Sequence, residues 1–151
     1  MTNNAKDYLR AAVAGASPVG LVVLLYERLI TDLTRAVAAM EKRDMEARTA
    51  EINHAFLILA QLEGSLDSSQ APEAARTQAL FYSVARAKIL EAHLKSSRQM
   101  LEEQIVLLHD VQAAWEQADP ARNARAHLSS HLARQAPDPS GEREAVLNTT
   151  A

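Results

Sequence analysis

The fold of this chain is decided by the stretch SPVGLVVLLYERLITDLTRAVAAM, residues 17–40. Ser17 offers a hydroxyl to cap a helix, and Pro18 suits the first helical position because no backbone N–H is needed there. From that start, large apolar residues recur at steps of three or four, which places them on one face of a helix. They are Val22, Leu25, Leu29, Leu33, Val37 and Met40. The stretch therefore predicts one long amphipathic helix.

Three further segments repeat this pattern. Asp44 is placed to cap a second helix, and Pro72 is placed to open a third. Ser96 and Gln99 have the spacing of a capping box for a fourth helix. The links between the four segments are short, so consecutive helices should lie antiparallel. We predict an all-α fold, an up-down-up-down four-helix bundle over residues 17–118.

The composition supports an all-α protein and excludes several functional classes. With 4 Gly and 5 Pro in 151 residues, the chain lacks the turn residues that a β-sandwich or barrel needs. The absence of Cys excludes disulfides and thiolate catalysis and favours a cytoplasmic location. A net charge of −3 without a basic cluster argues against nucleic-acid binding. No apolar run approaches the roughly 18 residues that membrane insertion requires.

The two ends of the chain differ from the bundle in character. Residues 1–16 are expected to form an N-terminal arm with a short helix, whose apolar side includes Tyr8 and Leu9. From residue 119 onward large apolar residues are sparse, and Pro137, Pro139 and Gly141 interrupt regular structure. We therefore expect residues 119–151 to form a weakly ordered, flexible tail, in which residues 121–135 could be helical.

Three of the predicted helices are locally more apolar than a bundle requires. The runs Leu21–Leu25, Phe56–Leu59 and Ile105–Leu108 extend around more than one helical turn, so part of each must point away from the core. Leaving a large aliphatic side chain in water forgoes roughly 1.5–3 kcal/mol relative to burial. A cover is therefore expected, and it is a segment of the chain itself, a second copy, or an amphipathic helix of a partner.

The sequence carries no recognisable catalytic or cofactor motif. A Glu-x-x-His pair occurs once, at Glu51 and His54, whereas di-iron bundles need two such pairs and further Glu ligands. A solvated helix face is the preferred interpretation of His54. His127 and His131 have metal-binding spacing, but no Glu follows the first His as a metalloprotease requires. We predict no catalytic residue, no cofactor and no metal site, and hence no enzyme.

Several motifs in order along the chain resemble one known family. They are Ser17-Pro18-x-x-Leu21, Leu24-Leu25-Tyr26-Glu27, Gln61-Leu62-x-x-Ser65-Leu66-Asp67, Phe81-Tyr82, Ile89-Leu90-Glu91-Ala92-His93 and Ala114-Trp115. Together they resemble the flagellin-specific export chaperones of the FliS family over residues 8–117. The chain departs from the family pattern at Glu27-Arg28, Ser83-Val84 and Ala87-Lys88.

The resemblance implies a cytoplasmic chaperone that uses no nucleotide. Such a protein holds the C-terminal helical segment of flagellin, prevents its premature polymerisation, and assists delivery to the flagellar type III export gate. It also implies that the arm covers part of the binding surface when the client is absent. The residues expected to line that surface are Tyr8, Leu9, Leu21, Leu25, Tyr26, Leu29, Phe56, Leu57, Phe81 and Tyr82. The alternative is a self-associating scaffold, a weak homodimer without a flagellin client.

Overall fold

The computed structural model describes residues 17–135, and this part of the chain is helical throughout, without a strand. The helices are α2 (Pro18–Glu41), α3 (Met45–Gly64), α4 (Pro72–Leu94), α5 (Arg98–Ala118) and α6 (Pro120–Gln135). The predicted arm, with Tyr8 and Leu9, lies outside the described residues, as does the end of the tail after residue 135.

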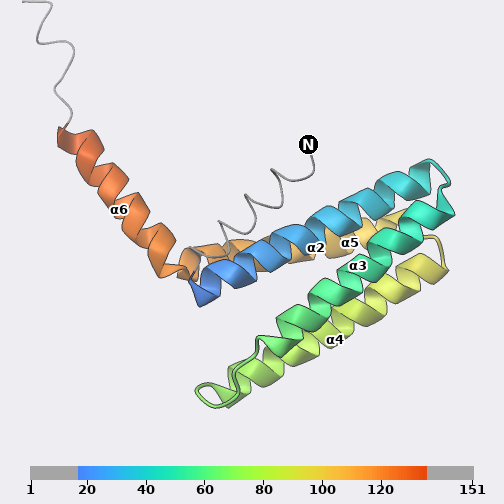
Figure 1. The fold of residues 1–151 in the computed structure, drawn as a ribbon, viewed down its shortest axis with the longest axis horizontal. Helices are drawn as coiled ribbons and strands as arrows, with labels where there is room; N and C mark the ends of the chain where they lie inside the picture. Colours follow the sequence, from blue (N-terminus) through green and yellow to red (C-terminus); the bar gives the residue numbers. More distant parts are fainter. Residues whose placement is uncertain (1–16, 136–151) are drawn as a thin grey trace, which may run out of the picture. The chain divides into compact units, whose positions relative to one another are not determined.

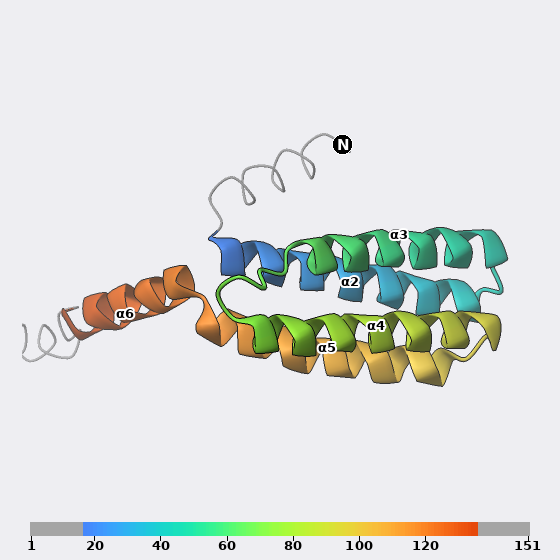
Figure 2. The same cartoon turned by 90° about the horizontal axis from the view of Figure 1, so that it is seen from below.

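Helices α2 to α5 form the antiparallel four-helix bundle that the sequence predicts. Helix α2 packs against α3 and α5, and α4 packs against the same two helices, so each helix occupies one corner (Figures 1 and 2). The connections between them are short, and each helix runs back along the previous one. This is the geometry expected when short links join amphipathic helices.

Local capping explains where the helices begin. Ser17 accepts a hydrogen bond from the Gly20 backbone N–H at 3.0 Å, and Asp44 accepts one from Ala47 at 3.0 Å. For α5 the predicted cap was one residue out: Ser97 caps the helix, accepting from Met100. Ser96 instead has a φ of 50°, the left-handed conformation that ends α4. The Ser97 N–H bonds the Ala92 carbonyl at 2.8 Å, which closes this helix end.

The core is a continuous cluster of apolar side chains from all four helices. Leu29 and Leu33 of α2, Leu59 of α3, Ile89 of α4 and Leu101 of α5 are completely buried. The cluster includes two tyrosines, Tyr26 and Tyr82, which are 1% exposed. Their hydroxyls lie 3.3 Å apart and form a hydrogen bond between α2 and α4, helices at opposite corners. Each polar tip therefore has a partner, as burial of a tyrosine requires.

A buried carboxylate joins α2 to α3, and sequence reasoning missed it. Asp32 is fully buried, and its Oδ2 lies 2.5 Å from Nδ1 of His54. The Nε of Arg28 lies 3.2 Å from the other oxygen, which makes an ion pair but not an aligned hydrogen bond. The interpretation of His54 as part of a solvated face was therefore wrong in one respect, because its ring is half-exposed but pairs with a core carboxylate. A buried charge needs such partners.

The surplus of apolar side chains is confirmed. Ile58, Leu59 and Leu108 from the apolar runs are buried, whereas other members of the same runs point outward. The exposed members are Leu21, Leu57, Val106 and Leu107. Successive helical residues lie about 100° apart, so one core cannot bury four in a row.

The first part of the predicted tail, residues 120–135, forms a helix, as its sequence allows. Ala, Arg, Leu and Gln accept helical geometry at little cost, and Pro120 occupies the first position. The chain divides into two compact units at this point, residues 1–119 and 120–151. Leu128 and Leu132 are about 60% exposed. Within residues 17–135, none of the helices has the length and hydropathy that a membrane crossing requires.

Candidate protein-binding groove

Two adjoining hollows lie at the end of the bundle where α2 begins and α5 ends. The first, about 280 Å³, is lined by Pro18, Val19, Leu21, Val22, Leu25, Ser65 and Trp115. The second, about 200 Å³, is lined by Val22, Ser65, Leu66, Asp67, Ala71, Ala74, Ala75, Gln78, Tyr82 and Trp115. Because they share three residues, Val22, Ser65 and Trp115, we treat them as one surface and name it the Trp115 groove.

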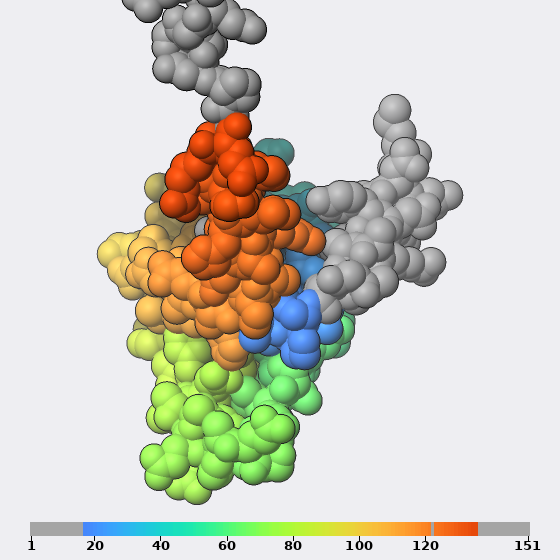
Figure 3. Space-filling view, turned by 90° about the vertical axis from the view of Figure 1, so that its left-hand side faces the viewer, coloured from blue at the N-terminus to red at the C-terminus, as the bar shows by residue number. Residues whose placement is uncertain are grey.

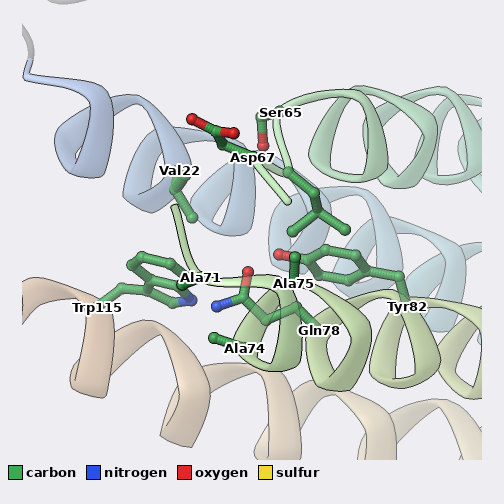
Figure 4. Close-up of a pocket in the computed structure, with 10 residues that line it drawn as sticks. Val22, Ser65, Asp67, Ala71, Ala74, Ala75, Gln78, Tyr82 and Trp115 are labelled. Carbon is green, nitrogen blue, oxygen red and sulfur yellow. The ribbon is translucent and has the colours of Figure 1, made fainter. Parts of the chain in front are cut away.

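The groove is built by helix ends and by the segment between α3 and α4. Figure 4 shows Val22 of α2 and Trp115 of α5 on one side of the second hollow, with Tyr82 of α4 across from them. Ser65 and Asp67 come from the segment that follows α3. In Figure 3 the start of α2 lies beside the green atoms of this part of the bundle. The Ser17 hydroxyl donates to Asp119 at 2.9 Å, which ties the two helix ends together.

The polar members of the groove lining are Ser65, Asp67, Gln78 and Tyr82, and the Tyr82 hydroxyl is hydrogen-bonded to that of Tyr26. Burial raises the pKa of Tyr26 well above its ordinary value, and the hydrogen bond to Tyr82 acts in the same direction. Burial also raises the pKa of Tyr82, with a further contribution from Glu63, although its bond to Tyr26 acts against this. Both phenols are therefore neutral at physiological pH. The groove presents mainly aliphatic and aromatic carbon to a partner.

The raised pKa values predict that the bundle loses stability in alkali. Above about pH 10 an unfolded tyrosine releases its proton while a buried one retains it, so the folded state binds more protons and stability falls as pH rises. We expect a slope of up to about 1.4 kcal/mol per pH unit for each tyrosine. Urea unfolding between pH 9 and 11.5 measures this slope. Tyr82→Phe should make it shallower, and an unchanged slope would contradict the assignment.

The structure separates the predicted binding residues into three groups. Leu21 and Leu25 line the first hollow of the Trp115 groove, and Tyr82 lines the second. Tyr26 and Leu29 are buried in the core and line neither hollow. Three other predicted binding residues, Phe56, Leu57 and Phe81, lie elsewhere on the bundle. Leu57 is 62% exposed, and the two phenylalanines pack against the core.

Two important groove residues were not among the predicted binding residues. Sequence reasoning placed Val22 on the apolar face of the first helix and named Trp115 in a family motif, and both pack against the core cluster. They are only partly buried, because they lie at the end of the bundle where no further turn covers them. Both residues lie near a helix end in the sequence, and this position was the signal that could have indicated partial exposure.

The groove and the fold define a class of protein. Each hollow is smaller than the roughly 300–1,000 Å³ of a typical small-molecule site, and the apolar lining suits the side chains of a docked helix. Among residues 17–135, no three His, Asp or Glu side chains gather as metal ligands would. The molecule is thus a helical bundle with an open apolar groove, the form of a protein-binding module.

Comparison with known proteins identifies the family. The sequence model described as "Flagellar protein FliS" matches residues 1–122, so the chain belongs to the FliS family. The "Flagellar secretion chaperone FliS" of Salmonella typhimurium is 29% identical over 113 residues, 74% of this chain and 84% of that protein. The "Flagellar secretion chaperone FliSB" of Pseudomonas aeruginosa is 29% identical over 72% of this chain and 86% of its own length. The "Flagellar secretion chaperone FliS" of Bacillus subtilis is 25% identical over 126 residues, which are 83% of this chain and 93% of that protein.

Family membership confirms the resemblance that the ordered motifs indicated. It places the chain among secretion chaperones and not among enzymes. The match ends at residue 122, so nearly all of α6 lies beyond it.

Proposed function

We propose that this protein is a cytoplasmic export chaperone that holds the C-terminal helical segment of flagellin in the Trp115 groove. The observation that carries the proposal is the pair of adjoining apolar hollows in a member of the FliS family. A client helix with apolar residues at i, i+3, i+4 and i+7 would place successive side chains in the two hollows. Covering these side chains would keep flagellin from polymerising.

The N-terminal arm is proposed to occupy the same groove when no client is present. Pro18 and Val19 line the first hollow, so residues 1–16 lead directly away from it along the chain. Tyr8 and Leu9 are the arm residues proposed to fill the hollows. A client would then displace a short tethered segment, which protects the apolar surface without blocking it permanently.

The surface proposed to receive the client extends beyond the groove. Leu57 is an exposed apolar residue on α3, and Phe56 and Phe81 are partly exposed neighbours of the core. A client that folds on binding can wrap a large surface, because its ordering cost is offset by a large buried area. We further propose that the complex is delivered to a component of the flagellar type III export gate.

Co-expression with a C-terminal flagellin fragment tests the proposed function. We expect a soluble one-to-one complex that survives gel filtration at micromolar concentration, and we expect the fragment to aggregate when expressed alone. Circular dichroism should show helix content above the sum of the separate components, because the client orders on binding. Failure of the full chain to bind the fragment at micromolar concentration would contradict the proposal.

A further inference from the structure

Another hollow lies at the far end of the bundle from the Trp115 groove. It is formed where α2 ends, where α3 begins and where α4 turns into α5, three places that meet at one end of the bundle (Figure 2). Its volume is about 240 Å³, and it shares no lining residue with the groove. The polar residues that line it are Arg43, Asp44, Arg48 and Ser96, and Met45 lies beside them. We name it the Arg48 hollow.

The guanidinium of Arg48 is buried at this hollow without a counter-ion. The residue is 7% exposed, and none of the ion pairs among residues 17–135 includes it. Its Nη1 donates to the Ser96 hydroxyl at 2.9 Å, and its Nη2 lies 2.7 Å from the Met45 sulfur. Its Nε has no hydrogen-bond partner. The two groups that Arg48 contacts are uncharged, so its charge is not compensated.

The other buried charge of the bundle shows what Arg48 lacks. Among residues 17–135, Asp32 and Arg48 are the two buried polar or charged residues. Asp32 pairs with both His54 and Arg28, which lie on either side of its carboxylate. A buried charge is costly unless an opposite charge pairs with it. The Arg48 hollow is therefore electrostatically incomplete in the isolated chain.

The surroundings of the hollow do not supply the missing negative charge. Asp44 is the one acidic residue among those that line it, and its Oδ1 caps α3 by accepting from the Ala47 backbone N–H at 3.0 Å. Arg43, exposed to solvent, adds a second positive charge. Burial lowers the pKa of His93, and the charge of Arg48 acts in the same direction, so His93 is neutral at physiological pH. The positive end of the α3 dipole also lies here, because α3 begins at Met45.

We propose that the Arg48 hollow binds a phosphate group, either the free ion or a phosphate monoester. Guanidinium N–H groups match phosphate oxygens in geometry, and a helix N-terminus favours an anion. A guanidinium has five N–H donors, and Ser96 and Met45 engage two of those of Arg48. Phosphate directs its oxygens in several directions, so one edge can face Arg48 while another faces Arg43.

The hollow has the room and the access that this ligand requires. A water molecule takes about 30 Å³ of liquid, so the hollow accommodates a phosphate together with several waters. Met45 is 59% exposed and has a flexible side chain, so it can turn aside and leave Nη2 of Arg48 to the ligand. Because the hollow and the Trp115 groove share no residue, the inference stands independently of the proposed flagellin client.

Titration of the full, ¹⁵N-labelled chain with sodium phosphate, at neutral pH and constant ionic strength, tests the proposal. We expect saturable shifts of the backbone amide signals of Met45, Arg48, Ser96 and Ser97, with a dissociation constant of about 1 mM. Sodium acetate should not saturate these signals up to about 30 mM. O-phosphoserine distinguishes the two sources of the phosphate group. Binding at least about threefold tighter than that of the free ion assigns the hollow to a monoester, and equal or weaker binding assigns it to free phosphate.

Substitution of Arg48 locates the binding. Arg48→Met keeps a long apolar side chain and removes the charge, so it should raise the dissociation constant at least about tenfold. Because the charge has no counter-ion in the free chain, the melting temperature should stay the same or rise. The matched control is Arg86→Met, the same change at an arginine that pairs with Glu63 and does not line the hollow. It should leave the dissociation constant within about twofold.

Arg43→Gln provides a variant that does not depend on a buried position. Arg43 is exposed, so the substitution should leave the fold intact, and loss of its charge should weaken phosphate binding about threefold. This measurement tests the proposal even if Arg48→Met fails to fold.

Three outcomes would overturn the proposal. Shifts that do not saturate, or that spread over arginines outside the hollow, would mean an adventitious ion only. Saturation by acetate with the affinity of phosphate would mean that charge alone attracts the anion. Undiminished phosphate binding by both Arg48→Met and Arg43→Gln would place the ion elsewhere on the molecule.

Discussion

Replacing Leu21 by aspartate is expected to weaken capture of the flagellin segment at least about 100-fold while the bundle stays folded. Leu21 lines the first hollow of the Trp115 groove and is 36% exposed without a client. A docked apolar helix would strip water from the new carboxylate, which costs about 2.7 kcal/mol or more without a partner. Leu21 is the fourth residue of α2, and a negative charge near the start of a helix is stabilised by the helix dipole.

Leu128→Asp is the matched control for this experiment. It makes the same chemical change at an exposed leucine of α6, which lines neither hollow and lies beyond the family match. Isothermal titration with the flagellin fragment should give an affinity within about twofold of the unsubstituted chain. Equal weakening by both substitutions would mean that net charge, and not the groove, governs capture.

Replacing Leu29 by alanine is expected to destabilise the bundle by about 2–5 kcal/mol. The side chain is completely buried in the core cluster, so its removal leaves a cavity that neighbouring side chains fill only in part. Small domains are stable by only about 5–15 kcal/mol, so this is a large fraction of the total. The melting temperature should fall by at least about 8 °C, measured by circular dichroism.

Leu57→Ala provides the comparison, because sequence reasoning placed both leucines on the binding surface. Leu57 is 62% exposed on α3, and its truncation should change stability by less than about 0.5 kcal/mol. If Leu57→Ala proved as destabilising as Leu29→Ala, the orientation of α3 or α2 in the bundle would be wrong.

The helices of the bundle were predictable because their signals are local. Ser17 and Asp44 cap α2 and α3 where the sequence places them, and Pro72 opens α4. The one departure has a local cause as well. Either Ser96 or Ser97 could act as a cap, and the left-handed turn at Ser96 leaves the role to Ser97. Residues 120–135 form the helix that their composition allows, although they have few apolar residues.

The candidate site was predictable only in part, because binding surfaces depend on how each helix is rotated about its axis. Of the residues predicted to bind the client, Leu21 and Leu25 line the groove, whereas Tyr26 and Leu29 of the same helix are buried in the core. The apolar run of α2 offers several rotations that bury a similar amount of carbon.

The sequence by itself determined the class of fold, the capped starts of α2 and α3, the excess of apolar carbon and the family. These depend on residue types and spacings along one chain. Only the tertiary structure decided which apolar faces are covered, because that depends on side chains of different helices competing for one interior. It paired Tyr26 with Tyr82 and set Asp32 against His54. It left the Trp115 groove open, because four helices can enclose only the faces that they turn towards one another.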